Sequence, residues 1–253
     1  MGRIVTQACR LLRALHALFS GGPNSEEVLL SMWRLLALLV LAACATTPDR
    51  PATVLAIGDS VLAFHSLTGG SVPEVAGRLA GVAVENRAVS GARFSATSPR
   101  VANKGGDIRR QYEGGPWETL LLNGGANDLM SECGCRACAA TLDELVTADG
   151  RKGEMPEFLR PIAQGGTLVV ILGYYDGNSR PNVFSGCSDE IDVLNARLAR
   201  FAADTSGVDF ISAAPAMDPD DQSLWYIDRV HPSRKGSARI GGLLAPTLVS
   251  GSS

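Results

Sequence analysis

The chain has 253 residues, of which 45% are hydrophobic, and its formal net charge is −3. This length and hydrophobic content predict a single globular domain with a packed core and exclude an intrinsically disordered chain. The slightly acidic charge balance and the lack of a long basic run argue against a nucleic-acid-binding surface. We therefore expect no nucleic-acid partner.

The first 43 residues are typical of an export signal and not of a folded domain. Leu35 to Ala43 form an unbroken apolar run that follows Met32-Trp33-Arg34, a short positive segment. The run is too short to span a bilayer but has the length of a signal-peptide hydrophobic region. Because a complete signal-like unit begins at Met32, we predict that translation starts there. Residues 1–31 would then be a mis-assigned upstream extension.

The end of the apolar run, Leu41-Ala42-Ala43-Cys44, resembles the lipobox of bacterial lipoproteins. The resemblance implies that cleavage precedes Cys44, that this cysteine is lipidated, and that residues 44–51 form a short tether. It also implies a lipid anchor on the periplasmic face of a bacterial membrane. The alternative is a plain secretory signal with a chance cysteine.

From residue 52 onwards, apolar segments alternate with helix-like segments over a predicted domain of residues 52–250. Such alternation predicts an α/β fold in which helices cover both faces of a parallel sheet. Right-handed crossovers then bring the loops that follow the strands to one edge, where sites lie in such folds. The predicted strands are 52–57, 82–89, 117–123, 167–173 and 208–212, and the predicted helices are 71–80, 104–113, 139–148, 154–164, 188–204 and 234–248.

A candidate nucleophile follows the first predicted strand. The apolar run Val54 to Ile57 ends in Gly58-Asp59-Ser60. Gly58 permits a tight turn, and Asp59 and Ser60 are both good helix N-caps. Ser60 would therefore lie on the rim of the sheet beside outward-pointing backbone N–H groups, which suits an exposed nucleophile. The alternative is an ordinary capped strand-to-helix turn.

Three further segments bring candidate catalytic groups to the same edge. Gly91 follows the second predicted strand and could direct its backbone N–H at a ligand. Asn127 follows the third and offers a side-chain amide donor. Near the C-terminus, Asp228 and His231 could act as a pair in which His231 is a base and Asp228 holds its tautomer. Taken singly, these would be a loop glycine, a turn residue and a solvated histidine.

Taken together, these segments resemble the SGNH (GDSL-type) hydrolase family over roughly residues 52–248. The resemblance rests on Gly58-Asp59-Ser60, Gly91, Gly125-Ala126-Asn127-Asp128 and Asp228-Arg229-Val230-His231, in the order of the family. It implies a flavodoxin-like three-layer α/β/α sandwich with five parallel strands, and serine hydrolase activity. It further implies that Ser60 is the nucleophile, His231 the base and Asp228 its orienting partner. The oxyanion hole would comprise Ser60 N–H, Gly91 N–H and the Asn127 side chain.

The cysteines form a second cluster. Cys133, Cys135 and Cys138 lie close together in sequence, and Cys187 follows the fourth predicted strand. These thiols could bind zinc, but an exported protein meets an oxidising compartment, which favours two disulfides. Each of the three possible pairings joins Cys187 to the cluster, and the sequence leaves the pairing open. We expect neither a metal nor another cofactor.

The sequence thus predicts a monomeric serine esterase at the cell envelope that cleaves a small-molecule or glycan ester through an acyl-enzyme. One alternative is a carbohydrate O-deacetylase acting on polysaccharide or peptidoglycan, and another is a non-catalytic envelope-binding lipoprotein. A nucleotide-binding domain is disfavoured because no glycine-rich phosphate loop follows the first strand. Several aromatic residues near the predicted rim could line an acyl or sugar pocket or could only cover the core edge: Phe64, Tyr174, Tyr175, Trp225 and Tyr226.

Overall fold

The computed structural model describes residues 52–95 and 102–250. The predictions about the signal region, the upstream extension, the lipidation of Cys44 and the tether concern residues outside these ranges. Within them, none of the helices has the length and apolar character needed to cross a membrane.

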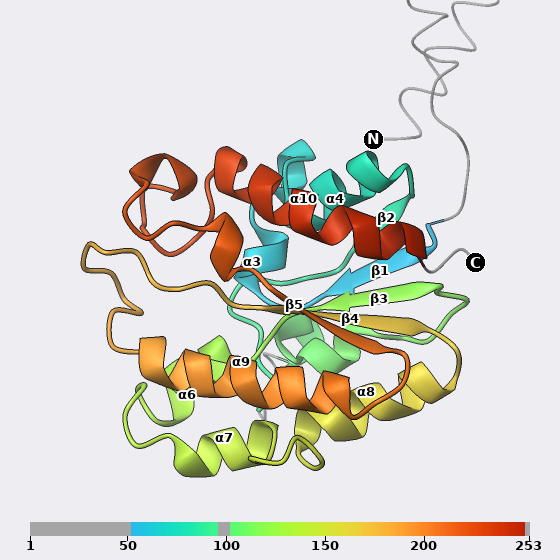
Figure 1. The fold of residues 1–253 in the computed structure, drawn as a ribbon, viewed down its shortest axis with the longest axis horizontal. Coiled ribbons are helices and arrows are strands. Elements are labelled where there is room, and N and C mark those ends of the chain that lie inside the picture. Colours follow the sequence, from blue (N-terminus) through green and yellow to red (C-terminus); the bar gives the residue numbers. More distant parts are fainter. Residues whose placement is uncertain (1–51, 96–101, 251–253) are drawn as a thin grey trace, which may run out of the picture. The chain divides into compact units, whose positions relative to one another are not determined.

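In the described part of the chain, five parallel strands form one sheet with the order β2-β1-β3-β4-β5 (Figure 1). This is the flavodoxin-like order, and with the flanking helices it confirms the predicted three-layer sandwich. The strands are β1 (Val54–Ile57), β2 (Val84–Asn86), β3 (Thr119–Leu122), β4 (Leu168–Gly173) and β5 (Val208–Ser212).

The register of the central strands aligns their carboxyl ends. Strands β1, β3 and β4 are almost entirely apolar because helices cover both faces of the sheet. Ile57 of β1 lies beside Leu122 of β3, which lies beside Ile171 of β4. The loops that follow β1 and β3 therefore start side by side, at the left-hand edge of the sheet in Figure 1.

Helices cover the two faces of the sheet in separate groups (Figure 1). On one face, α4 packs against α10, and the short helix α3 adjoins α4. The opposite face carries α6, α7, α8 and α9. The helix bounds are α3 (Ser60–Ala63), α4 (Val72–Ala80), α6 (Ala126–Glu132), α7 (Ala139–Leu145), α8 (Glu154–Gln164), α9 (Ser188–Ala203) and α10 (Arg234–Ser250).

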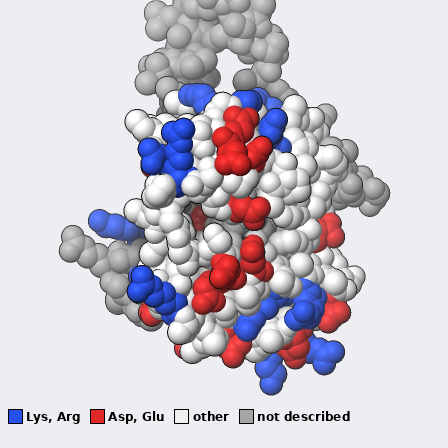
Figure 2. All heavy atoms as spheres, turned by 60° about the vertical axis from the view of Figure 1, so that its left-hand side comes forward, with Lys and Arg blue, Asp and Glu red and all other residues white. Residues whose placement is uncertain are grey.

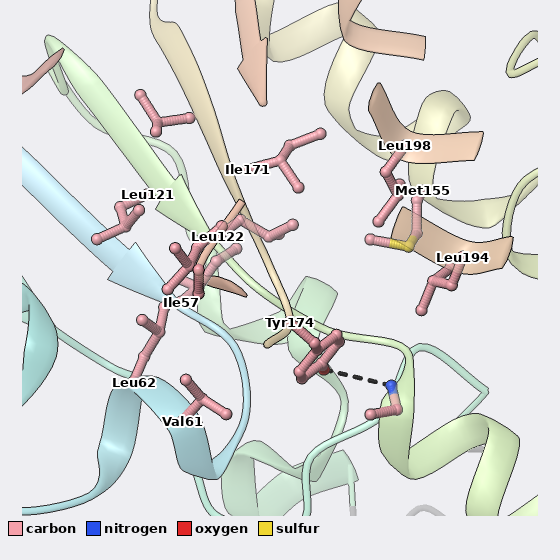
Figure 3. Packing of buried hydrophobic residues seen from close by; sticks show 14 of the residues in the cluster. Ile57, Val61, Leu62, Leu121, Leu122, Met155, Ile171, Tyr174, Leu194 and Leu198 are labelled. Carbon is pink, nitrogen blue, oxygen red and sulfur yellow. Dashed lines mark hydrogen bonds between the residues drawn. The ribbon is translucent and has the colours of Figure 1, made fainter. Parts of the chain in front are cut away.

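Part of the core lies between the sheet and helix α9 (Figure 3). Ile171 of β4 faces Leu194 and Leu198 of α9, and Met155 of α8 lies beside them. All four side chains are at most 1% exposed. Each such side chain contributes about 1.5–3 kcal/mol through removal from water, so this packing fixes the position of α9 on the sheet.

The predicted helix 104–113 is wrong. The structure has two short elements there instead, a π-helical turn at Ala102–Gly106 and a 3-10 turn at Ile108–Gln111. The backbone departs from helical angles at Lys104 and Gly105, where Gly105 has a φ of +78°. A Cβ at Gly105 would lie 2.7 Å from Val89 Cγ2. The positive φ and the close approach to Val89 both favour glycine at position 105, where the regular helix is interrupted.

Smaller differences concern the second strand and helix α6. Strand β2 ends at Asn86, three residues earlier than predicted, so Gly91 lies within the following loop and not at the strand end. Helix α6 was not among the predicted helices. It has 7 residues, too few for a clear apolar periodicity.

The four clustered cysteines form two disulfides, Cys133–Cys138 and Cys135–Cys187. Cys187 is thus joined to the cluster, as each possible pairing required. Cys187 is the N-cap of α9, and Cys135 follows the C-terminal end of α6. The second disulfide therefore ties the start of α9 to the segment after α6.

Candidate active site

The geometry of the chain at Ser60 depends on a glycine. Gly58 directly follows β1 and has a φ of +146°. A Cβ at this position would lie 2.2 Å from Asn123 Oδ1. Only glycine fits so close an approach. Asp59 then caps helix α3, with its Oδ1 accepting Val61 N–H at 3.0 Å. Ser60 is the first residue of that helix and is partly exposed.

Asp59 is a buried carboxylate with several donors. It is 1% exposed. Asn123 Nδ2 donates to Asp59 Oδ1 at 2.8 Å, and Asp59 N–H donates back to Asn123 Oδ1 at 3.1 Å. The Tyr174 hydroxyl donates to Asp59 Oδ2 at 2.5 Å. These hydrogen bonds connect the ends of β1, β3 and β4 through Asp59, the residue that precedes Ser60.

One cavity brings together all five residues that the sequence singled out for catalysis. Ser60, Gly91, Asn127, Asp228 and His231 all line it. We call it the His231 cavity, and its remaining walls come from Ser90, Val183, Phe184 and Val230. No hydrogen bond joins Ser60 Oγ to His231 in the described structure, which is common before substrate binds.

The His231–Asp228 pair has the geometry of an oriented base. His231 Nδ1 lies 2.7 Å from Asp228 Oδ2, and His231 N–H and Val230 N–H both donate to Asp228 Oδ1 at 3.0 Å. Partial burial acts to raise the pKa of Asp228, but hydrogen bonds from the His231 side chain and the two backbone N–H groups outweigh it. The net pKa of Asp228 is below its ordinary value, so the carboxylate stays ionised beside the imidazole.

The candidate oxyanion donors differ in their availability. Within residues 52–95 and 102–250, neither Ser60 N–H nor Gly91 N–H donates to another group. Gly91 has a φ of +78°, a conformation that glycine adopts without strain. Asn127 Nδ2, in contrast, donates to Ala92 O at 3.2 Å and to Asp59 Oδ2 at 3.4 Å.

A second cavity adjoins the first. Ser60, Asn127, Phe184 and Val230 line both. We call it the Tyr174 cavity. Its apolar walls come from Val61, Ala126, Tyr174, Tyr175, Phe184, Ile191, Trp225 and Val230, and Asp59, Asp176, Gly177, Asn182, Ser188, Asp192 and Arg229 complete it.

Charge at the Tyr174 cavity is predominantly negative. Asp176 and Asp192 both line it, and both are exposed. Slight desolvation of its carboxylate and the nearby charges of Asp176 and Asp189 raise the pKa of Asp192 even though the residue is exposed. Figure 2, which brings the left-hand side of Figure 1 forward, shows acidic side chains along the middle of this face with basic ones to either side.

Of the five predicted aromatic residues, three line the Tyr174 cavity, and Phe64 and Tyr226 line neither cavity. Tyr174, Tyr175 and Trp225 line the Tyr174 cavity. Phe64 instead stacks on His231, and Tyr226 contacts Phe64 edge to face with ring centroids 4.9 Å apart.

Sequence reasoning missed the supporting role of two residues. Gln111 is 4% exposed and binds Gly58 twice: its Oε1 accepts Gly58 N–H at 2.7 Å and its Nε2 donates to Gly58 O at 3.0 Å. No local pattern points to Gln111, which is 53 residues from its partner. Asn123 directly follows β3 beside the recognised Gly125-Ala126-Asn127-Asp128 segment, and that position was the available signal.

The fold and this arrangement of residues agree with comparisons to known proteins. The family model described as GDSL-like lipase/acylhydrolase matches residues 56–239. The chain belongs to this family. It is therefore a serine hydrolase of the SGNH (GDSL) type, an esterase. A search of curated protein sequences found no match.

Solved structures of two other esterases resemble this chain at low sequence identity. Est24, a carbohydrate acetylesterase from Sinorhizobium meliloti, aligns with a TM-score of 0.58 and 16% identity, covering 79% of this chain and 99% of that one. The inhibitor-bound aryl esterase of M. smegmatis aligns with a TM-score of 0.54 and 14% identity, with coverages of 79% and 99%. At such identities the likeness establishes the shared fold.

Proposed function

We propose that this esterase hydrolyses a carboxylic ester with a neutral acyl group longer than acetyl, through an acyl-enzyme on Ser60, at the bacterial cell envelope. The observation that carries the reaction is the His231 cavity, where Ser60 lies with the 2.7 Å His231–Asp228 pair and the candidate donors Gly91 and Asn127. A binding module would need no such set.

The reaction follows from these groups. His231 Nε2 takes the proton of Ser60 Oγ as that oxygen attacks the ester carbonyl, while Asp228 holds the proton on Nδ1. Ser60 N–H, Gly91 N–H and Asn127 Nδ2 stabilise the oxyanion. The carbon–oxygen bond to the alcohol then breaks, and the alcohol leaves with the proton from His231. Water, deprotonated by His231, attacks the acyl-enzyme in the same way and releases the acid.

The positions of the two cavities orient the ester. His231 must reach the leaving-group oxygen to protonate it, and His231 lines the His231 cavity but not the Tyr174 cavity. The alcohol therefore leaves from the His231 cavity. The acyl group, attached to the same carbonyl carbon at Ser60, then enters the Tyr174 cavity.

The walls of the Tyr174 cavity favour an apolar acyl group. The polar atoms of its aromatic residues are already bound to protein: the Tyr174 hydroxyl to Asp59, the Tyr175 hydroxyl to Val230 O at 2.8 Å, and Trp225 Nε1 to Asp218 O at 3.0 Å. These side chains therefore present an apolar surface to a ligand. The eight apolar residues that line this cavity are more than an acetyl group can contact, and the carboxylates of Asp176 and Asp192 would repel an anionic acyl end.

The second candidate function is carbohydrate O-deacetylation. It is supported by the likeness in fold to Est24, a carbohydrate acetylesterase. An acetyl group would contact few of the apolar residues that line the Tyr174 cavity, so this function predicts no benefit from longer acyl chains.

A panel of aryl esters with acyl chains of rising length, measured beside acetylated glycans, separates the two functions. We expect kcat/KM to rise with acyl length and then to fall when the cavity is full. Ile191→Phe, which narrows the Tyr174 cavity, should lower kcat/KM about tenfold or more for longer esters and spare the acetyl ester. Val193→Phe is the matched control, because Val193 lies on the same helix, is 40% exposed and does not line the cavity. A preference for acetylated glycans that Ile191→Phe leaves intact would support deacetylation instead.

The envelope location is proposed on the sequence of residues 41–44. A protein that carries a single acyl chain binds membranes only marginally, whereas one that carries two or more acyl chains is anchored stably. The native protein should partition into detergent, and a Cys44→Ser protein should be soluble or remain unprocessed. A cleaved Cys44→Ser protein that partitions as before would contradict lipidation at Cys44.

A further inference from the structure

The side-chain nitrogen of Asn127 already donates two hydrogen bonds to protein atoms. Its Nδ2 donates to Ala92 O at 3.2 Å and to Asp59 Oδ2 at 3.4 Å. An amide nitrogen carries two hydrogens, so an oxyanion can receive one only if an existing hydrogen bond is released. The bond to Asp59 is the longer and weaker of the two, and it is the one that we expect to break.

Release from Asn127 leaves Asp59 Oδ2 with another donor. Asp59 is 1% exposed, so little of its surface is open to a water molecule that could replace a lost hydrogen bond. The Tyr174 hydroxyl, however, donates to the same oxygen at 2.5 Å. A hydrogen bond from a hydroxyl to a carboxylate is short and strong. Oδ1 is satisfied separately, by Val61 N–H and Asn123 Nδ2.

The position of the Tyr174 hydroxyl is fixed from several sides. Tyr174 follows β4 directly, and its backbone N–H and C=O both bind the side-chain amide of Asn195, at 2.9 and 3.0 Å. The same hydroxyl accepts Ala126 N–H at 3.2 Å, as the dashed line in Figure 3 shows. Ala126 precedes Asn127 at the start of α6, so Tyr174 is held against both Asp59 and the helix that carries Asn127.

We propose that Tyr174 is a positioning residue that frees Asn127 for the oxyanion. Its hydroxyl keeps a hydrogen bond to Asp59 Oδ2 when Asn127 releases that oxygen. Without the hydroxyl, Asp59 Oδ2 would have Asn127 as its remaining donor. Leaving a buried carboxylate oxygen without a hydrogen-bond donor costs free energy. Asn127 would therefore stay bound to Asp59, and the oxyanion would lose a donor. The proposal rests on the proposed function, because it requires that Asn127 serve the oxyanion.

Tyr174 remains a donor at any working pH. Burial raises the pKa of its hydroxyl well above the ordinary value, and the neighbouring Asp59 carboxylate adds to the effect. The proton that Asp59 Oδ2 requires is therefore always present.

A double-mutant cycle in Tyr174→Phe and Asn127→Ala tests the proposal. Asn127→Ala should lower kcat about 10²–10³-fold, the usual loss for one oxyanion donor. Tyr174→Phe should lower kcat about 10- to 100-fold with little change in KM, because the effect is confined to the transition state. In the Asn127→Ala background, Tyr174→Phe should have little further effect on kcat, since the residue through which it acts is gone.

Tyr175→Phe is the matched control for the cycle. Tyr175 is the next residue in the chain and is buried to a similar degree, but its hydroxyl binds Val230 O and not Asp59. Any effect of Tyr175→Phe on kcat should be the same with and without Asn127. Equal losses from Tyr174→Phe in both backgrounds would mean a merely structural role and would overturn the proposal. An Asn127→Ala protein with unchanged kcat would instead overturn the oxyanion role of Asn127 in the proposed function, and the tyrosine proposal with it.

A second measurement needs no substitution, and it applies even where Tyr174→Phe fails to fold because Ala126 N–H loses its acceptor. It is a crystal structure of the wild-type protein with an alkylphosphonate bound covalently to Ser60, which mimics the tetrahedral intermediate. We expect Asn127 Nδ2 within hydrogen-bond distance of the phosphonyl oxygen and beyond that distance from Asp59 Oδ2, with the Tyr174–Asp59 bond kept. An adduct in which Asn127 stays on Asp59, or in which Tyr174 leaves it, would overturn the proposal.

Discussion

The ring of Phe64 lies parallel to the imidazole of His231, with ring centroids 4.4 Å apart and planes 8° apart. Phe64 is the C-cap of α3, the four-residue helix that begins with Ser60. The element that carries the candidate nucleophile therefore also supplies the surface against which the candidate base packs. This contact couples the two groups across a distance of 171 residues in sequence (from 60 to 231).

Loss of this stacking should impair catalysis. Phe64→Ala would remove the flat face that restricts the imidazole, so kcat should fall about 3- to 10-fold, in line with the energy of an aromatic pair. Steady-state kinetics on one aryl ester would measure it. His65→Ala is the control, because His65 Nε2 lies 3.2 Å from Pro232 O and His65 does not line either cavity. If Phe64→Ala left kcat as in the wild type, the stacking would have no catalytic role.

Asp228 should matter less than His231 but still strongly. Asp228→Asn keeps a group beside His231 Nδ1 but loses control of the tautomer, so we expect kcat to fall by about 10⁴-fold. His231→Ala should cost about 10⁶-fold, as in the comparable subtilisin case. Kinetics on variants shown to be folded by near-UV dichroism would give the ranking. A larger loss for Asp228→Asn than for His231→Ala would show that the roles are misassigned.

The lowered pKa of Asp228 also predicts how stability depends on pH. Because the folded-state pKa is below the ordinary value of 3.8, ionised Asp228 stabilises the fold above that value, and this contribution is lost as pH falls through the folded-state pKa. The wild type should therefore lose more stability than Asp228→Asn between pH 5 and about pH 2. Urea midpoints of both proteins across this range would measure the difference. Parallel curves for the two proteins would contradict the assigned direction of the shift.

The two disulfides should differ in their contribution to stability. Cys135–Cys187 spans 52 residues of sequence and Cys133–Cys138 spans 5. Restriction of the unfolded chain then contributes about 4 kcal/mol for the long loop and about 2 kcal/mol for the short one. Paired substitution of Cys135 and Cys187 by alanine should lower the free energy of unfolding more than the same substitution of Cys133 and Cys138. The reverse order in denaturant titrations would refute this reasoning.

The long-range disulfide should also influence specificity. Cys187 follows Asn182 and Phe184, which line the Tyr174 cavity. Loss of Cys135–Cys187 should therefore raise KM for longer acyl esters more than for the acetyl ester. The Cys133/Cys138 double variant provides the matched control, because neither residue adjoins the cavity wall. An equal change in KM across acyl lengths would mean that the disulfide does not influence how the enzyme binds the acyl group.

Much of the fold was accessible from the sequence because apolar strands and amphipathic helices alternate clearly. The strand after residue 207 and the helix 154–164 have the predicted bounds. The helix predicted at 104–113 was wrong because Gly105 has a positive φ and lies close to Val89, neither of which a local pattern reveals. Helix α6 is too short to produce a periodic signal.

Only the parts of the candidate site that lie in short local segments could be predicted from the sequence. Gly58-Asp59-Ser60 and Asp228 to His231 could be recognised because, together with Gly91 and Asn127, they resemble the motifs of the SGNH family in its order. The supports could not, because they are tertiary contacts: Gln111 binds Gly58 and Tyr174 binds Asp59, the latter across 115 residues. Tyr174 was identified as a pocket candidate, but nothing in the sequence indicated that its hydroxyl binds Asp59.

Covalent labelling of Ser60 tests the central claim most directly. An alkyl fluorophosphonate should form a single adduct, located by peptide mass spectrometry on Ser60, and hydrolysis of aryl esters should fall in proportion to labelling. A folded Ser60→Ala protein should be neither labelled nor active, with kcat reduced about 10⁶-fold. A label on another residue, or substantial esterase activity in the folded Ser60→Ala protein, would contradict the assignment of Ser60 as the nucleophile.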